Sequence, residues 1–258
     1  MVSTSAEYRL IAANLDRSLA TTAAKPSVAV ESRYYLDHID EIRSIGDFIR
    51  NTRVFNYAMK AFGLEDMTQA KGLVRKILEG GLDDPKSLGN RIGDDRFREL
   101  AATFNFVRDG ENATDKTAAR QGVVDRYVRQ TLEADAGDDN QGVRLALYFQ
   151  RKAADINSYY DILADAALTK VVKTALGLPE EMSSADIDRQ VAAISARLSL
   201  ADLKDPEKLD RLLTRFAAGY DAEDTTNADP ILALFDPSSG PTLDLDLILQ
   251  LQKLKHGG

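Results

Sequence analysis

The sequence predicts an all-α protein built from two related helical units and a C-terminal helical tail. Apolar residues recur every three to four positions along most of the chain, which is the spacing of one helix face. The segment from Glu41 to Leu64 has a related copy from Asp155 to Leu178, in which each position is shifted by 114 (155 − 41). Apart from one ambiguous segment near the C-terminus, no stretch carries convincing strand signals.

Two helices are expected before and at the start of the repeated segment. The first runs from residue 8 to about residue 21, where the apolar positions share one face: Leu10, Ile11, Leu15 and Leu19. Lys25-Pro26-Ser27 ends this helix, because proline lacks an amide proton and restricts the residue before it. A longer helical pattern begins near Val28 and reaches Ile42.

The repeated segment itself carries the signals that start and stop helices. Ser44 can act as an N-cap, and Asp47 stands three residues later, where its carboxylate can return a hydrogen bond to the cap amide. Asn51-Thr52 is expected to divide the run into two shorter helices. Gly63 stands where a left-handed residue ends a helix. The second copy keeps the cap, the carboxylate and the glycine, at Ser158, Asp161 and Gly177.

Further matched elements follow in both copies. An amphipathic helix is expected over residues 68–79, with a counterpart over residues 184–198. Asp84-Pro85 and Asp205-Pro206 each predict a helix start, with aspartate as the cap and proline at the first helical position. The repeat then spans residues 8–105 and 122–221. We divide the chain into four parts: a first helical repeat (1–106), a linker or surface crossing (107–121), a second helical repeat (122–222) and a tail (223–258).

The second repeat is expected to begin with a helix through Val123 and Leu132, continue through an acidic loop over residues 133–142, and enter a strong helix from Val143 to about Ala164. The tail closes with a leucine-rich segment that alternates as a strand does and also fits one helical face. We favour a helix, because its Leu, Gln, Asp and Lys residues are poor strand formers and Thr242 can cap it. Its apolar face is the candidate partner-binding surface, either docking on its own chain or pairing with a neighbour: Leu243, Leu247, Leu251 and Leu254.

Composition narrows the functional classes. With 41 acidic and 33 basic residues the net charge is −8, which gives no general attraction to nucleic acid or to an anionic membrane surface. No apolar run reaches the length of a transmembrane helix, so we expect no membrane insertion. Charged residues interrupt the N-terminus where a cleaved signal needs an apolar core. The chain contains no cysteine, so the sequence fits a cytoplasmic protein or one exported without a cleaved signal.

Candidate chemical groups do not assemble into a recognisable site. The carboxylates of the acidic loop do not follow the spacing of a twelve-residue calcium loop. His38 and His256 are isolated, and without thiolates they do not form a zinc site. No glycine pattern matches a phosphate or dinucleotide loop. The repeated aromatic pairs, Tyr34-Tyr35 and Tyr148-Phe149, are interpreted as core or packing residues. We therefore expect no enzymatic activity, catalytic residue, cofactor or bound metal.

Six segments resemble an uncharacterised bacterial family, the domain of unknown function numbered twelve-seventeen: Tyr8-Arg9-Leu10, Leu15-Asp16-Arg17-Ser18-Leu19, Tyr34-Tyr35, Ser44-Ile45-x-Asp47-Phe48, the run from Tyr57 to Met67, and the run from Gly142 to Phe149. The resemblance covers nearly the whole chain. It implies an alphaproteobacterial origin and a place among flagellar genes, and some members of the family carry the domain more than once. It implies no enzymatic activity.

These observations lead to one expectation and one alternative. We expect a non-enzymatic structural or interaction protein that is an accessory or exported component of flagellar assembly and that binds a protein partner or its own copies through the C-terminal helix. The alternative is a regulatory protein that binds a small molecule or ion between the two repeats, because interfaces between related units are common places for pockets.

Overall fold

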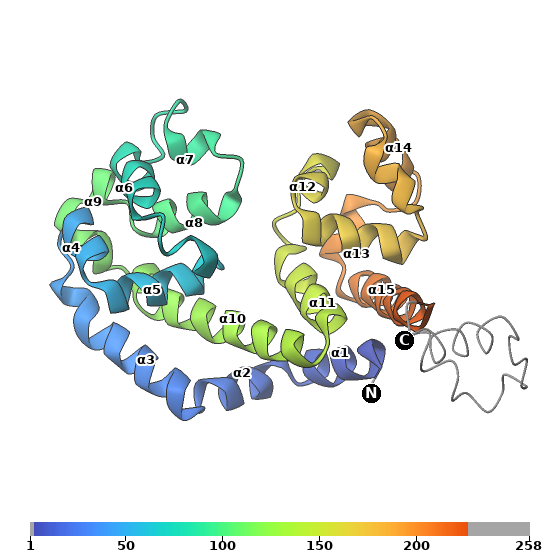
Figure 1. Cartoon of the computed structure of the whole chain (residues 1–258), viewed down its shortest axis with the longest axis horizontal. Coiled ribbons are helices and arrows are strands. Elements are labelled where there is room, and N and C mark those ends of the chain that lie inside the picture. Colours follow the sequence, from blue (N-terminus) through green and yellow to red (C-terminus); the bar gives the residue numbers. More distant parts are fainter. Residues whose placement is uncertain (1–2, 227–258) are drawn as a thin grey trace, which may run out of the picture.

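The computed structural model describes residues 3–226, and every regular element within them is an α-helix or a short 3-10 helix (Figure 1). The all-α fold class is therefore confirmed. The predicted contact residues Leu243, Leu247, Leu251 and Leu254 lie outside the described residues. None of the described helices combines the length and apolarity that a membrane crossing requires.

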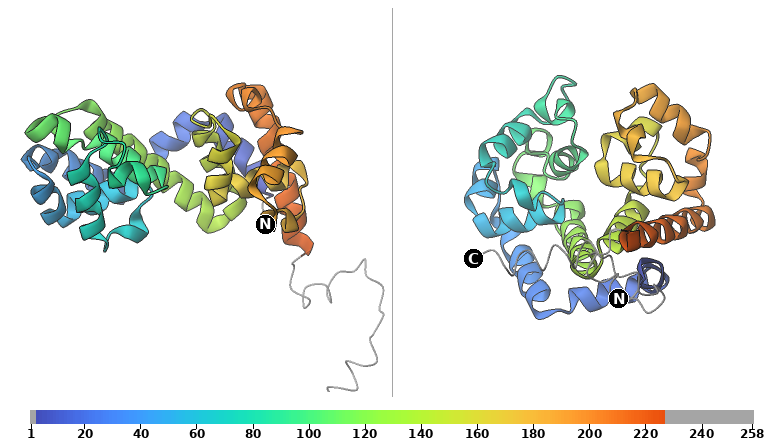
Figure 2. Two further views of the ribbon diagram at one scale, coloured as in Figure 1. Left: turned by 90° about the horizontal axis from the view of Figure 1, so that it is seen from above. Right: turned by 45° about the vertical axis from the view of Figure 1, so that its right-hand side comes forward.

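The helices gather around two hydrophobic cores. We call the first core and its helices the first lobe, and its helices after the N-terminal region are α3 (Pro26–His38), α4 (Ile45–Arg50), α5 (Thr52–Ala61), α6 (Lys71–Gly80), α7 (Leu88–Arg91), α8 (Asp95–Thr103) and α9 (Phe106–Asp109). The second lobe contains α11 (Gln141–Lys152), α12 (Tyr159–Ala164), α13 (Ala166–Leu176), α14 (Ile187–Ser195) and α15 (Pro206–Thr226). Figure 2 shows the two lobes as separate bodies joined along one side.

The long helix α10 (Gln121–Asp139) belongs to both lobes. Its first half contributes Val123, Val124, Tyr127 and Val128 to the first core, and Ala136 near its end belongs to the second core. Tyr127 stacks on Tyr57 of α5 with ring centroids 4.0 Å apart. At the other end of α10, the side chain of Asn140 accepts hydrogen bonds from the amides of Gly142 and Val143 and starts α11. Helix α10 therefore connects the two lobes.

The two N-terminal helices pack beside α10 and the second lobe. Helices α1 (Thr4–Ala13) and α2 (Leu15–Ala23) replace the single predicted helix over residues 8–21, because the chain leaves the helical conformation at Asn14. Helix α2 packs on α10, and α1 packs on α11 and α15 of the second lobe (Figure 1). Helix α3 begins at Pro26, two residues before the start predicted near Val28, because the missing amide proton of proline costs nothing at the first helical position.

Most local signals within the repeated segment are confirmed. The hydroxyl oxygen of Ser44 accepts a hydrogen bond from the amide of Asp47 at the start of α4, and Asn51 caps α5. In the second copy, Ser158 and Asp161 form a reciprocal capping box at the start of α12. Gly63 and Gly177 have φ values of 70° and 61°, which are the left-handed conformations expected after a helix. The duplication itself and the four-part division stay predictions.

The two Asp-Pro sites differ. At Asp205-Pro206 the prediction is correct, because the Asp205 carboxylate accepts hydrogen bonds from the amides of Glu207 and Lys208 and α15 begins at the proline. At Asp84-Pro85 it is wrong. There the carboxylate bonds to the amide of Lys86 within a turn, and the next helix begins only at Leu88.

The predicted helix from 143 to 164 is also wrong in its extent, because α11 ends at Lys152 and α12 begins at Tyr159. The ammonium group of Lys204 explains the break: it donates hydrogen bonds to the carbonyl oxygens of Ala153, Ala154 and Ile156. A cation placed at these carbonyls stabilises a helix end. The partner lies about fifty residues away in the chain, so local sequence does not reveal it.

The segment 107–121 packs on the first lobe through short helical turns. Ala113, Thr114 and Ala119 are buried. The hydroxyl of Thr114 donates to the carbonyl oxygen of Ile42 at 2.9 Å. The hydroxyl of Tyr35 donates to the carbonyl oxygen of Ala119 at 2.5 Å. The aromatic interpretation is thereby confirmed for Tyr35, and it holds equally for Phe149, which is fully buried in the second core.

Candidate functional site

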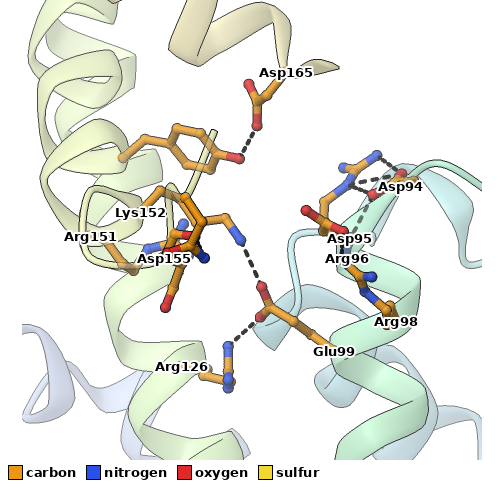
Figure 3. Close-up of polar contacts among 12 residues, drawn as sticks. Asp94, Asp95, Arg96, Arg98, Glu99, Arg126, Arg151, Lys152, Asp155 and Asp165 are labelled. Atoms are coloured by element: carbon orange, nitrogen blue, oxygen red, sulfur yellow. Dashed lines mark hydrogen bonds and ion pairs between the residues drawn. The ribbon is translucent and has the colours of Figure 1, made fainter. Parts of the chain in front are cut away.

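Charged side chains meet where the two lobes face each other. We define the junction as Glu99 of α8, three residues of α10 (Arg126, Arg129 and Glu133) and two residues at the end of α11 (Arg151 and Lys152). Figure 3 shows Glu99 extending from the first lobe toward Lys152 and Arg126. Its carboxylate accepts hydrogen bonds from the Lys152 ammonium at 2.6 Å and from the Arg126 guanidinium at 2.7 Å. The Glu99–Lys152 pair thus connects α8 directly to the second lobe.

Glu133 is the buried centre of the junction, and its side chain is only 2% exposed. Arg151 donates to both carboxylate oxygens, at 2.8 and 2.9 Å. Arg129 donates to one of them at 2.8 Å and also to the carbonyl oxygen of Leu147 at 2.9 Å. Two guanidinium groups therefore hold one buried carboxylate, and together they tie α10 to α11.

This arrangement corrects the prediction of an acidic loop over residues 133–142. Residues 133–139 are the last two turns of α10, and only Asn140 leaves the helix. The aspartate and glycine residues of this stretch are poor helix formers in isolation. Their helix is stabilised by tertiary contacts, because Glu133 is paired and Ala136 and Gly137 are buried. Gly137 also permits a close approach, since an added Cβ would lie 2.6 Å from the Cδ atom of Arg144.

The environment shifts the pKa of two junction residues. Burial alone raises the pKa of Glu99, but the hydrogen bond from Lys152 and the charges of Lys152 and Arg126 outweigh it and the pKa is lowered. Burial lowers the pKa of Arg151, and its bonds to Glu133 outweigh that effect and raise it. Both pKa shifts favour the charged forms of Glu99 and Arg151, which therefore stay ionised at neutral pH.

Two further polar contacts border the junction (Figure 3). The hydroxyl of Tyr148 donates to the Asp165 carboxylate at 2.5 Å, and the other oxygen of Asp165 caps α13. Burial, followed by this bond to a carboxylate, raises the pKa of the Tyr148 hydroxyl well above its ordinary value. This hydroxyl therefore stays protonated at neutral pH. Across the junction, Arg96 donates to the Asp94 carboxylate and to the carbonyl oxygen of Gly63.

A pocket of about 220 Å³ opens beside these groups. It is lined by Ala61, Asp125, Arg126, Arg129, Gln130 and Arg151. A guanidinium group carries five N–H donors, and the bonds described above use two from Arg129 and two from Arg151. Three arginines, each paired with a carboxylate, and one further carboxylate, that of Asp125, therefore line the pocket. An anion bound there would use the donors that these pairs leave over.

The junction was not predicted from the sequence. Arg126, Arg129 and Glu133 are spaced three and four residues apart, which indicates one helix face, but their partners on α8 and α11 come from distant segments. His38 stacks on Tyr34 and its Nδ1 lies 2.9 Å from the Tyr34 carbonyl oxygen, consistent with a structural histidine. Within residues 3–226, no group of histidine and carboxylate side chains has the arrangement of a metal site.

Comparisons with known proteins place these observations in context. A family model described as a protein of unknown function, DUF1217, matches residues 61–209. The X-ray crystal structure of a protein from Agrobacterium tumefaciens, a target of the Northeast Structural Genomics Consortium, is 44% identical in sequence. The similarity covers 87% of this chain and 97% of that one, with a TM-score of 0.79. No curated protein matches.

Proposed function

The chain belongs to the DUF1217 family, whose function is unknown, and we propose that it is a non-enzymatic structural or interaction protein that serves as an accessory or exported component of flagellar assembly. The observation that carries the proposal is the junction, where the charged groups pair with one another. Glu133 is held by two arginines and Glu99 by an arginine and a lysine. Such pairing stabilises a relative orientation of the lobes.

The energetics of ion pairs support a structural reading of the junction. Exposed pairs contribute little, but removing one partner of a buried pair costs about 3–5 kcal/mol because the other charge is left uncompensated. With Arg129 11% exposed and Glu133 2% exposed, this pair is of the second kind. A two-lobed body held in this way presents fixed surfaces to a partner.

The surface of the second lobe offers one place for such a partner. Tyr160 of α12 and Ile187 of α14 are each 51% exposed, and these two helices pack together. The hydroxyl of Tyr160 donates to the Asp188 carboxylate at 3.1 Å, which fixes the ring. Tyrosine is enriched in protein interfaces. We propose this patch, together with the leucines at 243, 247, 251 and 254, as contact surfaces for proteins.

The flagellar part of the proposal follows from the family resemblance, and a deletion strain tests it. We expect the strain to swim less than the parent in soft agar, and a tagged chain expressed from its own locus to co-purify with flagellar components. A Tyr160→Ala variant should weaken that co-purification. The control variant Tyr159→Phe, which leaves the exposed ring of Tyr160 in place, should not. Normal swimming together with no flagellar protein in the purified fraction would remove this part of the proposal.

A second candidate function is regulation by an anion that binds in the pocket beside Arg126, Arg129 and Arg151. A ligand that binds only the folded state raises the melting temperature. Inorganic phosphate or pyrophosphate should therefore raise it above that in sodium chloride of equal ionic strength. The Arg126→Gln variant should show the same melting temperature in phosphate as in sodium chloride, because it lacks one of the arginines that line the pocket. It should still fold, because Arg126 is 42% exposed and its removal leaves the Glu99–Lys152 pair intact. Equal melting temperatures in all the salts would exclude anion binding here.

A further inference from the structure

The N-terminal helix α1 is seated in the second lobe, far in sequence from the elements that hold it. Tyr8 is 1% exposed and belongs to the second core. The amide of Thr4 donates to the Asp221 carboxylate at 3.0 Å, and its hydroxyl lies within 2.9 Å of the Asn140 amide nitrogen. A guanidinium nitrogen of Arg9 lies 3.4 Å from the hydroxyl of Thr214. Helices α11 and α15 thus form a seat for α1.

The seat is shaped for close contact. A Cβ atom added at Gly142 would lie 2.7 Å from the Cγ2 atom of Thr4 and 2.6 Å from the ring of Tyr220. Real Cβ atoms do not approach other atoms that closely, so a glycine is required where α1 crosses the start of α11. The absence of a side chain at Gly142 therefore makes room for the arriving helix.

A single residue, Asn14, lies between α1 and α2. Asn14 is exposed, has φ −126° and ψ 36°, and separates α1 from α2. Its side-chain amide donates to the carbonyl oxygen of Leu10 at 3.1 Å and its backbone amide to that of Ile11 at 3.2 Å. If Asn14 became helical, residues 4–23 would form one straight helix about 30 Å long, and α1 would leave its seat.

We propose that α1 is an exchangeable arm and that its partner is the second lobe of another copy of this chain. The seat in the second copy is the same, so each contact of Tyr8, Thr4 and Arg9 is re-formed between chains. Exchange of identical elements is a low-cost route to dimers, and a reciprocal exchange leaves neither seat empty. The inference adds one named partner, a second copy of this chain, to the proposed function. It rests on that function only in treating the chain as an interaction protein.

Helix α1 crosses from one lobe to the other. Tyr8 precedes the first lobe along the chain, yet it belongs to the core of the second. Helix α10 also joins the two cores, but it does so as one continuous helix that follows the first lobe in the sequence. The crossing of α1 depends instead on the conformation at Asn14.

Substitution of the hinge tests the proposal. Asn14→Ala and Asn14→Gly both remove the bond to Leu10, but alanine favours the straight helix over glycine by up to about fivefold for each hinge, or about 25-fold for a reciprocal dimer with two hinges. Light scattering on the full chain across a concentration series should show more dimer for Asn14→Ala than for Asn14→Gly. Equal dimer fractions in the two variants would overturn the role of the hinge.

Chemical cross-linking identifies the surfaces. Since the chain has no cysteine, an Arg9→Cys chain can be mixed with a differently tagged Thr214→Cys chain and treated with a short bismaleimide. We expect a cross-linked heterodimer, and only background when Thr214→Cys is replaced by Lys76→Cys on α6 of the first lobe. A chain with both cysteines at 9 and 214 verifies the reach of the reagent. Equal yields for both mixtures, or none with Thr214→Cys, would reject the exchange.

The outcomes also separate this inference from the proposed function. Deleting residues 242–258 should leave the arm-exchanged dimer in place, and loss of the dimer would assign association to the tail instead. Arm exchange in a strain that swims normally would keep the inference and remove the flagellar part. Absence of exchange, with flagellar components still captured, would do the reverse.

Discussion

Replacing Glu133 with alanine should lower the free energy of unfolding by about 3–5 kcal/mol, because the guanidinium groups of Arg129 and Arg151, which are only 11% and 24% exposed, are then left without their carboxylate. The Glu133 side chain is 2% exposed, and it accepts one hydrogen bond from Arg129 and two from Arg151. Denaturant unfolding followed by circular dichroism measures the loss. The midpoint should fall with little change in the slope, because the surface exposed on unfolding is nearly the same.

Two companion variants make the Glu133 result specific. Asp135 lies two residues further along α10 and pairs with Lys25 at the surface. The Asp135 side chain is 41% exposed and that of Lys25 is 47% exposed. Asp135→Ala should therefore cost less than about 1 kcal/mol. Combining Glu133→Leu with Arg129→Met and Arg151→Met should recover most of the stability, because the buried charges disappear together. A loss for Glu133→Ala as small as that for Asp135→Ala would contradict the structural role of the junction.

The Glu133 environment shows why the sequence predicts the fold better than the site. Helix starts are local: Ser158 and Asp161 are three residues apart, and the capping box they predict is present. The junction is not local, because Arg151 lies 18 residues from Glu133 and Lys152 lies 53 residues from Glu99. From composition alone, residues 133–142 favour a loop. The helix forms there because tertiary pairing and burial outweigh weak intrinsic propensity.

The two Asp-Pro sites show the same limit at the scale of a single turn. Both pairs offer an aspartate cap and a proline at the first helical position. Only at Pro206 is the proline followed by a helix with a buried face, formed by Leu212, Leu213, Phe216 and Ala217. After Pro85 the chain turns, and the side-chain amide of Asn90 holds the turn by donating to the carbonyl oxygens of Leu82 and Asp84. A capping signal therefore specifies where a helix can start, and packing decides whether it does.

Replacing Gln130 with proline should separate the unfolding of the two lobes. The lobes have distinct cores, and α10 passes between them without interruption. Proline at 130 removes the hydrogen bond to the carbonyl of Arg126, clashes with that carbonyl and costs about 3 kcal/mol or more. It also disturbs the spacing of Arg126, Arg129 and Glu133, on which the junction depends. We expect the wild-type chain to unfold in one calorimetric transition and the Gln130→Pro variant to unfold in two.

The matched control is Gln130→Ala, which removes the same side chain while keeping α10 helical, and it should retain a single transition. The comparison of calorimetric and van't Hoff enthalpies distinguishes one cooperative unit from two. Two transitions in the wild-type chain would show that the junction does not couple the lobes. One transition in Gln130→Pro would show that the N-terminal helices alone are enough to couple them, since α1 is seated in the second lobe and α3 in the first. Only a continuous α10 that transmits stability between the cores predicts one transition for alanine and two for proline.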